Sequence, residues 1–347
     1  MCAKRRIHER PAAKRRAPLP PPAESDWPRY VPALIVAGLV AVSFADILAG
    51  MNGLWASDLS AYHHPLKQIF ASVVGQGTFP SWNPYLSGGQ PLAANPAFQT
   101  FYPPNWLVLL PPFAYWFQLH IILHVVIAGW GMLVFTRRLG LSRAVCLIGA
   151  LEFALGAPYL SLLVRLPFLF SLAWLPWLLT AVDHLITKPG ARSFGITAIV
   201  VGLQGLLGEP TVFVQSMVLA LVLVIWRSQE GKLRRNLISL GGSIGAGVLL
   251  AAVQLLPAID HARDSVRGDG FTWQISSNWS MPFSRLLEMF YPAVFRLFPG
   301  EAGQHALSGM YPFRIDAYIS EIYLGILPAV VLLAGLLTWH RAARWAV

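Results

Sequence analysis

The feature that most constrains this chain is a series of long apolar segments separated by short polar ones. Predominantly apolar residues fill eight segments: 30–50, 113–136, 144–160, 167–187, 193–208, 210–226, 237–256 and 318–339. Each approaches the roughly 20 residues that a helix needs to cross a bilayer. Charged residues make up only 12% of the chain, about half the share in a soluble domain, so the polar surface of a soluble protein is missing. The sequence therefore predicts an all-α integral membrane protein with about eight transmembrane helices.

The distribution of Lys and Arg predicts the orientation of these helices. With the N-terminus in the cytoplasm, 19 of the 26 Lys and Arg residues fall on the cytoplasmic side. Cytoplasmic segments of membrane proteins are enriched in these residues. We therefore expect a multi-pass protein of the cell membrane (inner or plasma membrane) with both termini in the cytoplasm. Because the positive charge is segregated by membrane side, the formal net charge of +10 does not indicate nucleic-acid binding.

The chain divides into a tail, a membrane core and two long outer loops. Residues 1–29 are rich in Lys, Arg and Pro and have almost nothing apolar to bury, which predicts a disordered cytoplasmic tail. A cleaved signal peptide is the alternative, although the leader is long and the sequence near Ala45 is a poor cleavage site. Residues 30–347 form the core, with outer loops at 51–112 and 257–317. Long loops that stay compact are usually functional.

The first outer loop places a carboxylate in front of an amphipathic segment. Apolar residues recur at helical spacing over 59–74, which predicts a helix lying at the membrane interface. Asp58 stands directly before this segment, at the N-cap position. Two interpretations stay open: a capping aspartate worth about 1 kcal/mol, or a general base held at the membrane surface. Asp46, near the end of the first span, is a weaker candidate for the same role.

The rest of this loop is dense in Pro, Gly, Asn and aromatic residues, so it cannot form a regular helix. Aromatic rings with a polar edge suit the lipid headgroup region, and they also offer flat faces to sugar rings. The candidates for binding a sugar or an acceptor are Tyr62, Trp82, Asn83, Tyr85 and Tyr102.

Charged residues on the outer side are candidates for contact with a phosphate-bearing donor. A guanidinium group binds phosphate bidentately, which favours Arg165 and Arg267, with Lys67 as a third candidate. The alternatives are that Arg165 extends to lipid headgroups and that Arg267 belongs to a self-neutralised helix face. Glu209, in a Gly-Glu-Pro turn between two spans, is the acidic candidate, ahead of Glu152 within a span.

Metal and nucleotide motifs are weak in this sequence. His120 and His124 have the i, i+4 spacing that can ligate zinc, but a third ligand is missing nearby. There is no Walker loop, no dinucleotide fingerprint and no serine elbow. We therefore predict no cofactor, with a divalent metal ion left open.

The order of these features resembles the bacterial YfhO-like membrane family of the glycosyltransferase C superfamily. The resemblance extends over residues 40–340. It rests on Asp58, Tyr62, Gly77, Pro80, WNPYLSGGQP (82–91), FYPPN (101–105), Gly208-Glu209-Pro210, QLLPAIDHARDSVRG (254–268) and MPFSRLLEMFYP (281–292). The start of the first loop is also similar to that of lipid A aminoarabinose transferases of the same superfamily, in which the aspartate is the catalytic base.

The resemblance implies a glycosyltransferase C-like enzyme that moves a sugar from a polyprenyl-phosphate donor to a cell-envelope polymer or lipid at the outer face. Asp58 would be the general base, and direct displacement would invert the anomeric centre. Members of the family are usually longer, so this chain would correspond to a fragment or a truncated member. Two alternatives stay open: a transporter or flippase of a lipid-linked sugar, or a non-catalytic subunit of envelope assembly. A transporter would place charge at mid-membrane in broken helices, whereas acidic and aromatic residues concentrate in the outer loops here.

Overall fold

The computed structural model describes residues 28, 30–85, 88–265, 268, 270–277, 281, 283–290 and 322–323. Nearly all of the predicted tail 1–29 and of the predicted eighth span 318–339 lies outside these residues, as does Arg267. The part of the chain that is described is mostly helical.

Five helical segments are long and apolar enough to cross a membrane, so the chain is a multi-pass helical membrane protein. They are α4 (Phe113–Arg138), the segment Arg143–Val164, α7 (Leu166–Thr187), α9 (Pro210–Arg227) and α10 (Leu233–Arg263). The segment Arg143–Val164 consists of α5 (Arg143–Leu155), α6 (Ala157–Leu160) and the 3-10 turn η4 (Ser161–Val164). It breaks at Gly156, whose backbone is extended.

Two of the predicted spans correspond to helices that are short for a membrane crossing. The first is α1 (Val31–Ser43), which ends at Phe44 before the single turn α2 (Ala45–Leu48). The fifth is α8 (Ala191–Gly205). With 13 and 15 residues, these helices are about 20 Å and 22 Å long, less than the roughly 30 Å of a hydrocarbon core. Of the seven predicted spans that fall within the described residues, five are therefore full-length candidate spans.

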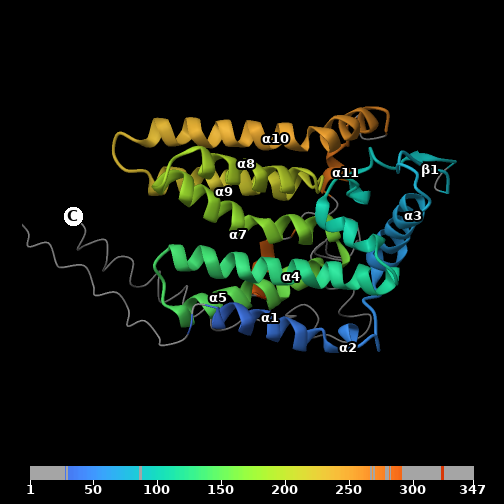
Figure 1. Cartoon of the computed structure of the whole chain (residues 1–347). Coiled ribbons are helices and arrows are strands. Elements are labelled where there is room, and N and C mark those ends of the chain that lie inside the picture. Colours follow the sequence, from blue (N-terminus) through green and yellow to red (C-terminus); the bar gives the residue numbers. More distant parts are fainter. Residues whose placement is uncertain are drawn as a thin grey trace, which may run out of the picture.

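The helices lie side by side, and the first outer loop covers one end of the bundle (Figure 1). We call this end the loop end and the opposite end, where the short turns are rich in Arg and Lys, the basic end. α4 and α7 pack along each other, and α10 lies along α8. Small residues allow the α8–α10 contact: a side chain at Gly247 would meet Val201, and one at Gly205 would meet Ala251.

The first outer loop contains the predicted interface helix. It begins with a π-helical turn, η1 (Leu59–His63), and continues as α3 (His64–Gly75), which buries Leu66 and Phe70. A small hairpin follows, in which β1 (Trp82–Asn83) pairs antiparallel with β2 (Gln90–Pro91). The loop ends in two 3-10 turns, η2 (Pro96–Phe98) and η3 (Pro103–Leu109).

The second outer loop begins as helix. α10 continues through Pro257 to Arg263, seven residues beyond the predicted end of the span at 256. Two short elements follow, α11 (Trp273–Ser277) and η5 (Phe283–Met289).

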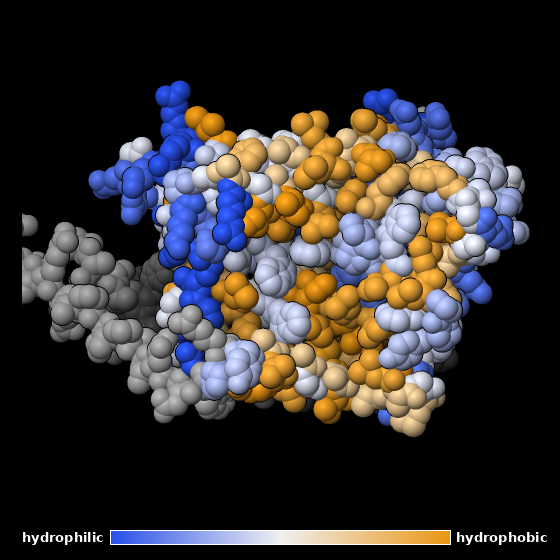
Figure 2. Space-filling view, viewed as in Figure 1, coloured by the Kyte–Doolittle hydropathy of each residue, from blue (hydrophilic) through white to orange (hydrophobic). Residues whose placement is uncertain are grey.

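The surface has the pattern expected of a protein in a bilayer. In Figure 2, apolar residues gather over the middle of the visible face, and hydrophilic residues gather toward its two ends. Large apolar side chains on α9 and α10 are exposed, among them Val214, Val218, Leu249 and Leu256. Apolar surface of this extent marks contact with a membrane or a partner.

Candidate functional site

The structure brings Asp58 and Arg165 together at the loop end of the bundle. Arg165 Nη1 donates to Asp58 Oδ2 at 3.0 Å, across 107 positions of sequence. The Asp58 side chain is 47% exposed and the Arg165 side chain 21%. The contact is only partly buried, and a surface ion pair contributes about 0–1 kcal/mol to stability, so Asp58 can exchange Arg165 for another ligand at little cost.

Local backbone geometry sets the position of both side chains. Asp58 precedes η1, and its side chain makes no capping hydrogen bond, so the interpretation as a helix cap is wrong for this structure. Ser57, directly before it, has a positive φ of 42°, a strained conformation for a residue other than glycine. Arg165 stands at the break between η4 and α7. Strained residues and π-helical turns both occur often at functional sites.

His63 lies buried next to this pair, and the sequence analysis did not single it out. It is only 5% exposed and follows Leu59 by one turn, on the face that also buries Leu66 and Phe70. Burial lowers the pKa of the His63 imidazole to about 3, and the nearby Lys67 and Arg165 add to this shift. His63 is therefore neutral at physiological pH. In the sequence, the sign that His63 is buried was its helical spacing from Leu59 and Leu66 on the apolar face.

Lys67 supports the loop from inside and does not reach a phosphate site. Its side chain is fully buried, and Nζ donates to Phe98 O at 2.7 Å and to Gln99 Oε1 at 2.8 Å. Burial lowers the pKa of this amine well below its usual value. The two acceptors engage two of the N–H groups of this amine. Asn105 Nδ2 donates to the same Phe98 carbonyl and to Gln99 O, so this buried cluster fixes the chain between η2 and η3.

Tyr102 is also buried, in a network that links the first loop to α4 and α7. His124 Nδ1 donates to His120 O at 2.8 Å, so His124 Nε2 accepts the Tyr102 hydroxyl hydrogen at 2.7 Å. The Tyr102 oxygen accepts in turn from Trp174 Nε1 at 2.7 Å. Burial raises the pKa of the Tyr102 phenol, which keeps it neutral. Tyr102 therefore does not face a sugar.

The same network bears on the histidine pair considered as a zinc site. Both ring nitrogens of His124 are engaged, by His120 O and by Tyr102, so neither is available to a metal. Within the described residues, no three His, Cys, Asp or Glu side chains gather in a way that could hold a metal ion.

The remaining candidates for binding a sugar or an acceptor divide into exposed and buried residues. Tyr62, Trp82 and Tyr85 are exposed, and Tyr85 is the most open of them at 79%. Asn83 is buried, and its Oδ1 accepts from Tyr85 N at 3.0 Å, which holds the turn of the hairpin. The 12 residues of α3, about 18 Å of helix, separate the hairpin from Asp58 along the chain.

Glu209 lies at a different place from the Asp58–Arg165 pair. Its carboxylate accepts from Thr211 N at 3.1 Å and caps α9, where the positive end of the helix dipole favours negative charge. It also lines a cavity of about 230 Å³ whose walls include neither Asp58 nor Arg165. A carboxylate in this position disfavours a phosphate, which is against the predicted role of Glu209 in holding one. Arg267 falls outside the described residues.

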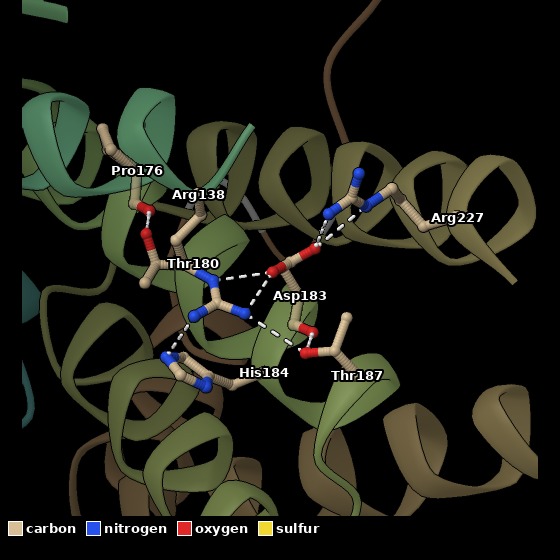
Figure 3. Close-up of polar contacts among 7 residues, drawn as sticks. All are labelled: Arg138, Pro176, Thr180, Asp183, His184, Thr187 and Arg227. Atoms are coloured by element: carbon tan, nitrogen blue, oxygen red, sulfur yellow. Dashed lines mark hydrogen bonds and ion pairs between the residues drawn. The ribbon is translucent and has the colours of Figure 1, made fainter. Parts of the chain in front are cut away.

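A second ion cluster, which the sequence analysis missed, lies at the basic end. Asp183 on α7 is buried, with a side chain only 1% exposed. Arg138 Nε on α4 donates to its Oδ2 at 2.6 Å, and Arg227 Nη2 on α9 lies 2.8 Å from its Oδ1 (Figure 3). Arg138 also contacts His184 Nε2 and Thr187 Oγ1. In the sequence, this cluster could have been suspected from Asp183, a lone acid near the end of the apolar segment 167–187. A charged side chain in a membrane segment costs free energy unless it is paired.

No family model, curated protein or solved structure matches the chain in comparisons with known proteins. The likeness to the YfhO-like family therefore rests on the sequence motifs alone. The fold and the geometry define a class: a multi-pass helical membrane protein with an accessible Asp–Arg pair at its loop end.

Proposed function

We propose that this protein is a membrane glycosyltransferase that moves a sugar from a polyprenyl-phosphate donor to a cell-envelope acceptor, with Asp58 as general base. The observation that carries the proposal is the Asp58–Arg165 pair, a carboxylate and a guanidinium that are both accessible at the loop end of an apolar bundle. A donor with an apolar tail and an anionic head must react where the bundle meets water. Asp58 lies on the loop segment that resembles the transferase family, and Arg165 reaches it from the start of α7.

The chemistry assigns different roles to the two partners. Asp58 accepts the proton of the acceptor hydroxyl while the hydroxyl oxygen bonds to the anomeric carbon and the bond from that carbon to the phosphate oxygen breaks. The phosphate leaves with the electron pair, and a guanidinium neutralises its charge through paired hydrogen bonds. Attacking and leaving oxygens stand on opposite sides of the carbon, so we take the Asp58–Arg165 contact to open when donor and acceptor are both bound.

The 3.0 Å contact between Asp58 and Arg165 therefore belongs to the donor-free state in this mechanism. A donor phosphate competes with Asp58 for Arg165, and its arrival frees the carboxylate. The base is then available only when a donor is bound, which limits proton abstraction without a donor. The low stability of an exposed ion pair makes this exchange possible.

The test uses the full chain reconstituted in vesicles that contain a radiolabelled polyprenyl-phosphate hexose and an envelope lipid extract as acceptor. Asp58→Asn should lower turnover by about 10²–10⁴-fold, the usual contribution of a general base. Arg165→Gln should raise KM for the donor more than it lowers kcat.

Asp260→Asn is the matched control, because Asp260 forms an exposed ion pair with Arg263 near the end of α10. Transfer by Asp58→Asn at the wild-type rate would overturn the proposal, and movement of intact donor across the bilayer without transfer would indicate a transporter.

We also propose the finer topology: eight spans in the cell membrane, with both termini and the basic end in the cytoplasm. The support is the charge count, since 19 of 26 Lys and Arg residues belong to this side. In this arrangement α1 and α8 are short spans and residues 318–339 form the last one.

Cysteine accessibility tests this topology in intact cells. Tyr85→Cys, on the exposed hairpin, should react with a membrane-impermeant maleimide added outside, whereas Gln229→Cys, between α9 and α10, should react only after the cells are opened. The reverse labelling would contradict the orientation.

A further inference from the structure

Two turns at the basic end carry exposed cations that have no role in the mechanism above. One turn joins α7 to α8, and the other joins α9 to α10. We call these turns, together with the first turn of the helix that follows each, the basic turns. Their exposed cations are Lys188, Arg192, Lys232, Arg234 and Arg235. Figure 2 shows hydrophilic residues gathered at this end, beside the apolar middle of the visible face.

Contacts between helices hold the two basic turns next to each other. Arg227, the last residue of α9, forms an ion pair with Asp183, which lies one helical turn before the end of α7. A side chain at Gly242 of α10 would meet the ring of Phe194 in the first turn of α8. The cations of the two turns therefore belong to one surface.

The positive charge of this surface is not balanced from within the described part of the chain. None of the five cations forms an ion pair there with an acidic side chain. Glu230 is the one acid in the basic turns, which leaves an excess of four positive charges. At the loop end, by contrast, Arg165 and Arg263 each pair with an aspartate. Like charges held together repel one another, so an anion from outside would stabilise the basic turns.

Apolar side chains place the basic turns at the surface of the membrane. Ile225 and Trp226, at the end of α9, are both exposed. The guanidinium group of Arg227 lies 5.8 Å from the centre of the Trp226 ring, and tryptophan side chains gather at the level of lipid headgroups. On α10, the exposed Ile238 follows Arg235 by three residues, about 4.5 Å of helix. The cations therefore begin where the apolar belt ends, which is the level of lipid phosphates.

This position decides between a lipid and a soluble polyanion as the partner. A soluble polyanion would approach from water and would gain nothing from the apolar border, whereas lipid headgroups lie along this border in any bilayer. The patch selects among lipids by charge. A zwitterionic headgroup brings a cation together with its phosphate, whereas phosphatidylglycerol and cardiolipin are net negative. Each cation near such lipids should raise their affinity roughly fivefold.

We propose that the basic turns bind net-negative phospholipids of the adjoining leaflet, with the lipid phosphates against the cations of the α7–α8 and α9–α10 turns. The inference does not depend on the proposed transferase activity, nor on which side of the membrane the basic end faces. It adds a lipid-binding surface at the end of the bundle opposite the Asp58–Arg165 pair.

Photolabelling of the full chain in phosphatidylcholine nanodiscs tests this surface. The probe is a trace of phosphatidylglycerol that carries a diazirine near its headgroup, a phosphatidylcholine with the same diazirine is the matched probe, and mass spectrometry locates the adducts. At low salt the anionic probe should label the basic turns about tenfold more strongly than the matched probe, and excess phosphatidylglycerol should compete. Equal labelling by the two probes would overturn the proposal. Inorganic phosphate that competes as well as phosphatidylglycerol would indicate a site for a soluble anion and would overturn it too.

Variants at exposed cations separate this surface from the general charge of the protein. Arg192→Gln and Arg234→Gln remove one charge from each turn and should each lower labelling by the anionic probe roughly fivefold, and the double variant about 25-fold. The double variant Arg192→Lys and Arg234→Lys keeps both charges and should keep most of the labelling. Arg263→Gln, which removes an exposed cation at the loop end, is the control and should not change it.

The outcome is independent of the transferase proposal. Asp58→Asn should be labelled like the wild type even if it abolishes sugar transfer. Unchanged labelling in the double glutamine variant, or an equal loss in Arg263→Gln, would overturn the assignment of anionic lipid to the basic turns.

Discussion

The two ion clusters at opposite ends of the bundle differ in burial and in the number of partners. Asp183 at the basic end is buried and shared between two arginines from two other helices (Figure 3). Asp58 at the loop end forms one ion pair among the described residues, with Arg165, and nearly half of its side chain is exposed. Removing one member of a buried pair leaves an uncompensated charge, whereas an exposed pair breaks at little cost. The difference indicates that the basic end holds helices together and the loop end can exchange ligands.

The backbone that carries the two clusters also differs: it is helical at the basic end and forms turns or breaks at the loop end. Asp183, Arg138 and Arg227 all belong to long regular helices, α7, α4 and α9. Asp58 follows the strained Ser57 and begins a π-helical turn, and Arg165 stands at a break between helices. Regular helices fix side chains firmly, while turns and breaks permit the small movements that ligand exchange requires.

The largest expected effect tests the structural role of the buried cluster. Asp183→Asn leaves Arg138 and Arg227 facing each other and should lower the free energy of unfolding by about 3 kcal/mol, the lower end for removing one buried partner, because both guanidinium groups can turn toward water. Titration with sodium dodecyl sulfate in mixed micelles measures this value. Asp260→Asn, in an exposed pair, is the control and should show no measurable change. Equal stability of both variants would remove the distinction between the two clusters.

The second prediction assigns acid sensitivity to the loop end. The pKa of His63 is about 3 in the folded chain, against about 6.5 when unfolded. Between these values the unfolded chain binds the extra proton, so stability falls as the pH falls from 7 toward 3. At pH 5 the loss should be about 2 kcal/mol.

The measurement is the unfolding free energy at pH 7 and pH 5 for the wild type and for His63→Gln. The variant lacks the titrating group, so its stability should change less with pH. A variant whose stability falls as steeply as that of the wild type would show that His63 is not the buried neutral group described above.

The smallest effect on stability is expected at the Asp58–Arg165 pair. Asp58→Asn and Arg165→Gln should each change the free energy of unfolding by less than about 1 kcal/mol, because the pair is only partly buried and Asp58 is nearly half exposed. The same micelle titration checks both. A loss comparable to that of Asp183→Asn would mean that this pair is structural, and it would weaken the argument for a site that exchanges ligands.

Helical segments could be predicted from the sequence because their cause is local. In a bilayer each backbone N–H and C=O group must form its hydrogen bond within its own segment. An apolar run of sufficient length therefore predicts a helix. The spans predicted at 113–136, 167–187 and 210–226 correspond closely to α4, α7 and α9, and the interface helix over 59–74 corresponds to η1 and α3. The length of α1 was overestimated, since the predicted span 30–50 forms a helix only over Val31–Ser43. Apolar composition alone does not set where a helix ends.

The sequence by itself determined the class of the protein, the approximate spans and the position of Asp58 before an interface helix. Only the tertiary structure decided which side chains meet. It paired Asp58 with Arg165, buried Lys67 and Tyr102 that the sequence had suggested as surface ligands, and shared Asp183 between two arginines. The physical reason is that sequence spacing specifies neighbours only within one helix or turn. Contacts between segments far apart depend on how the helices pack, which no local pattern encodes.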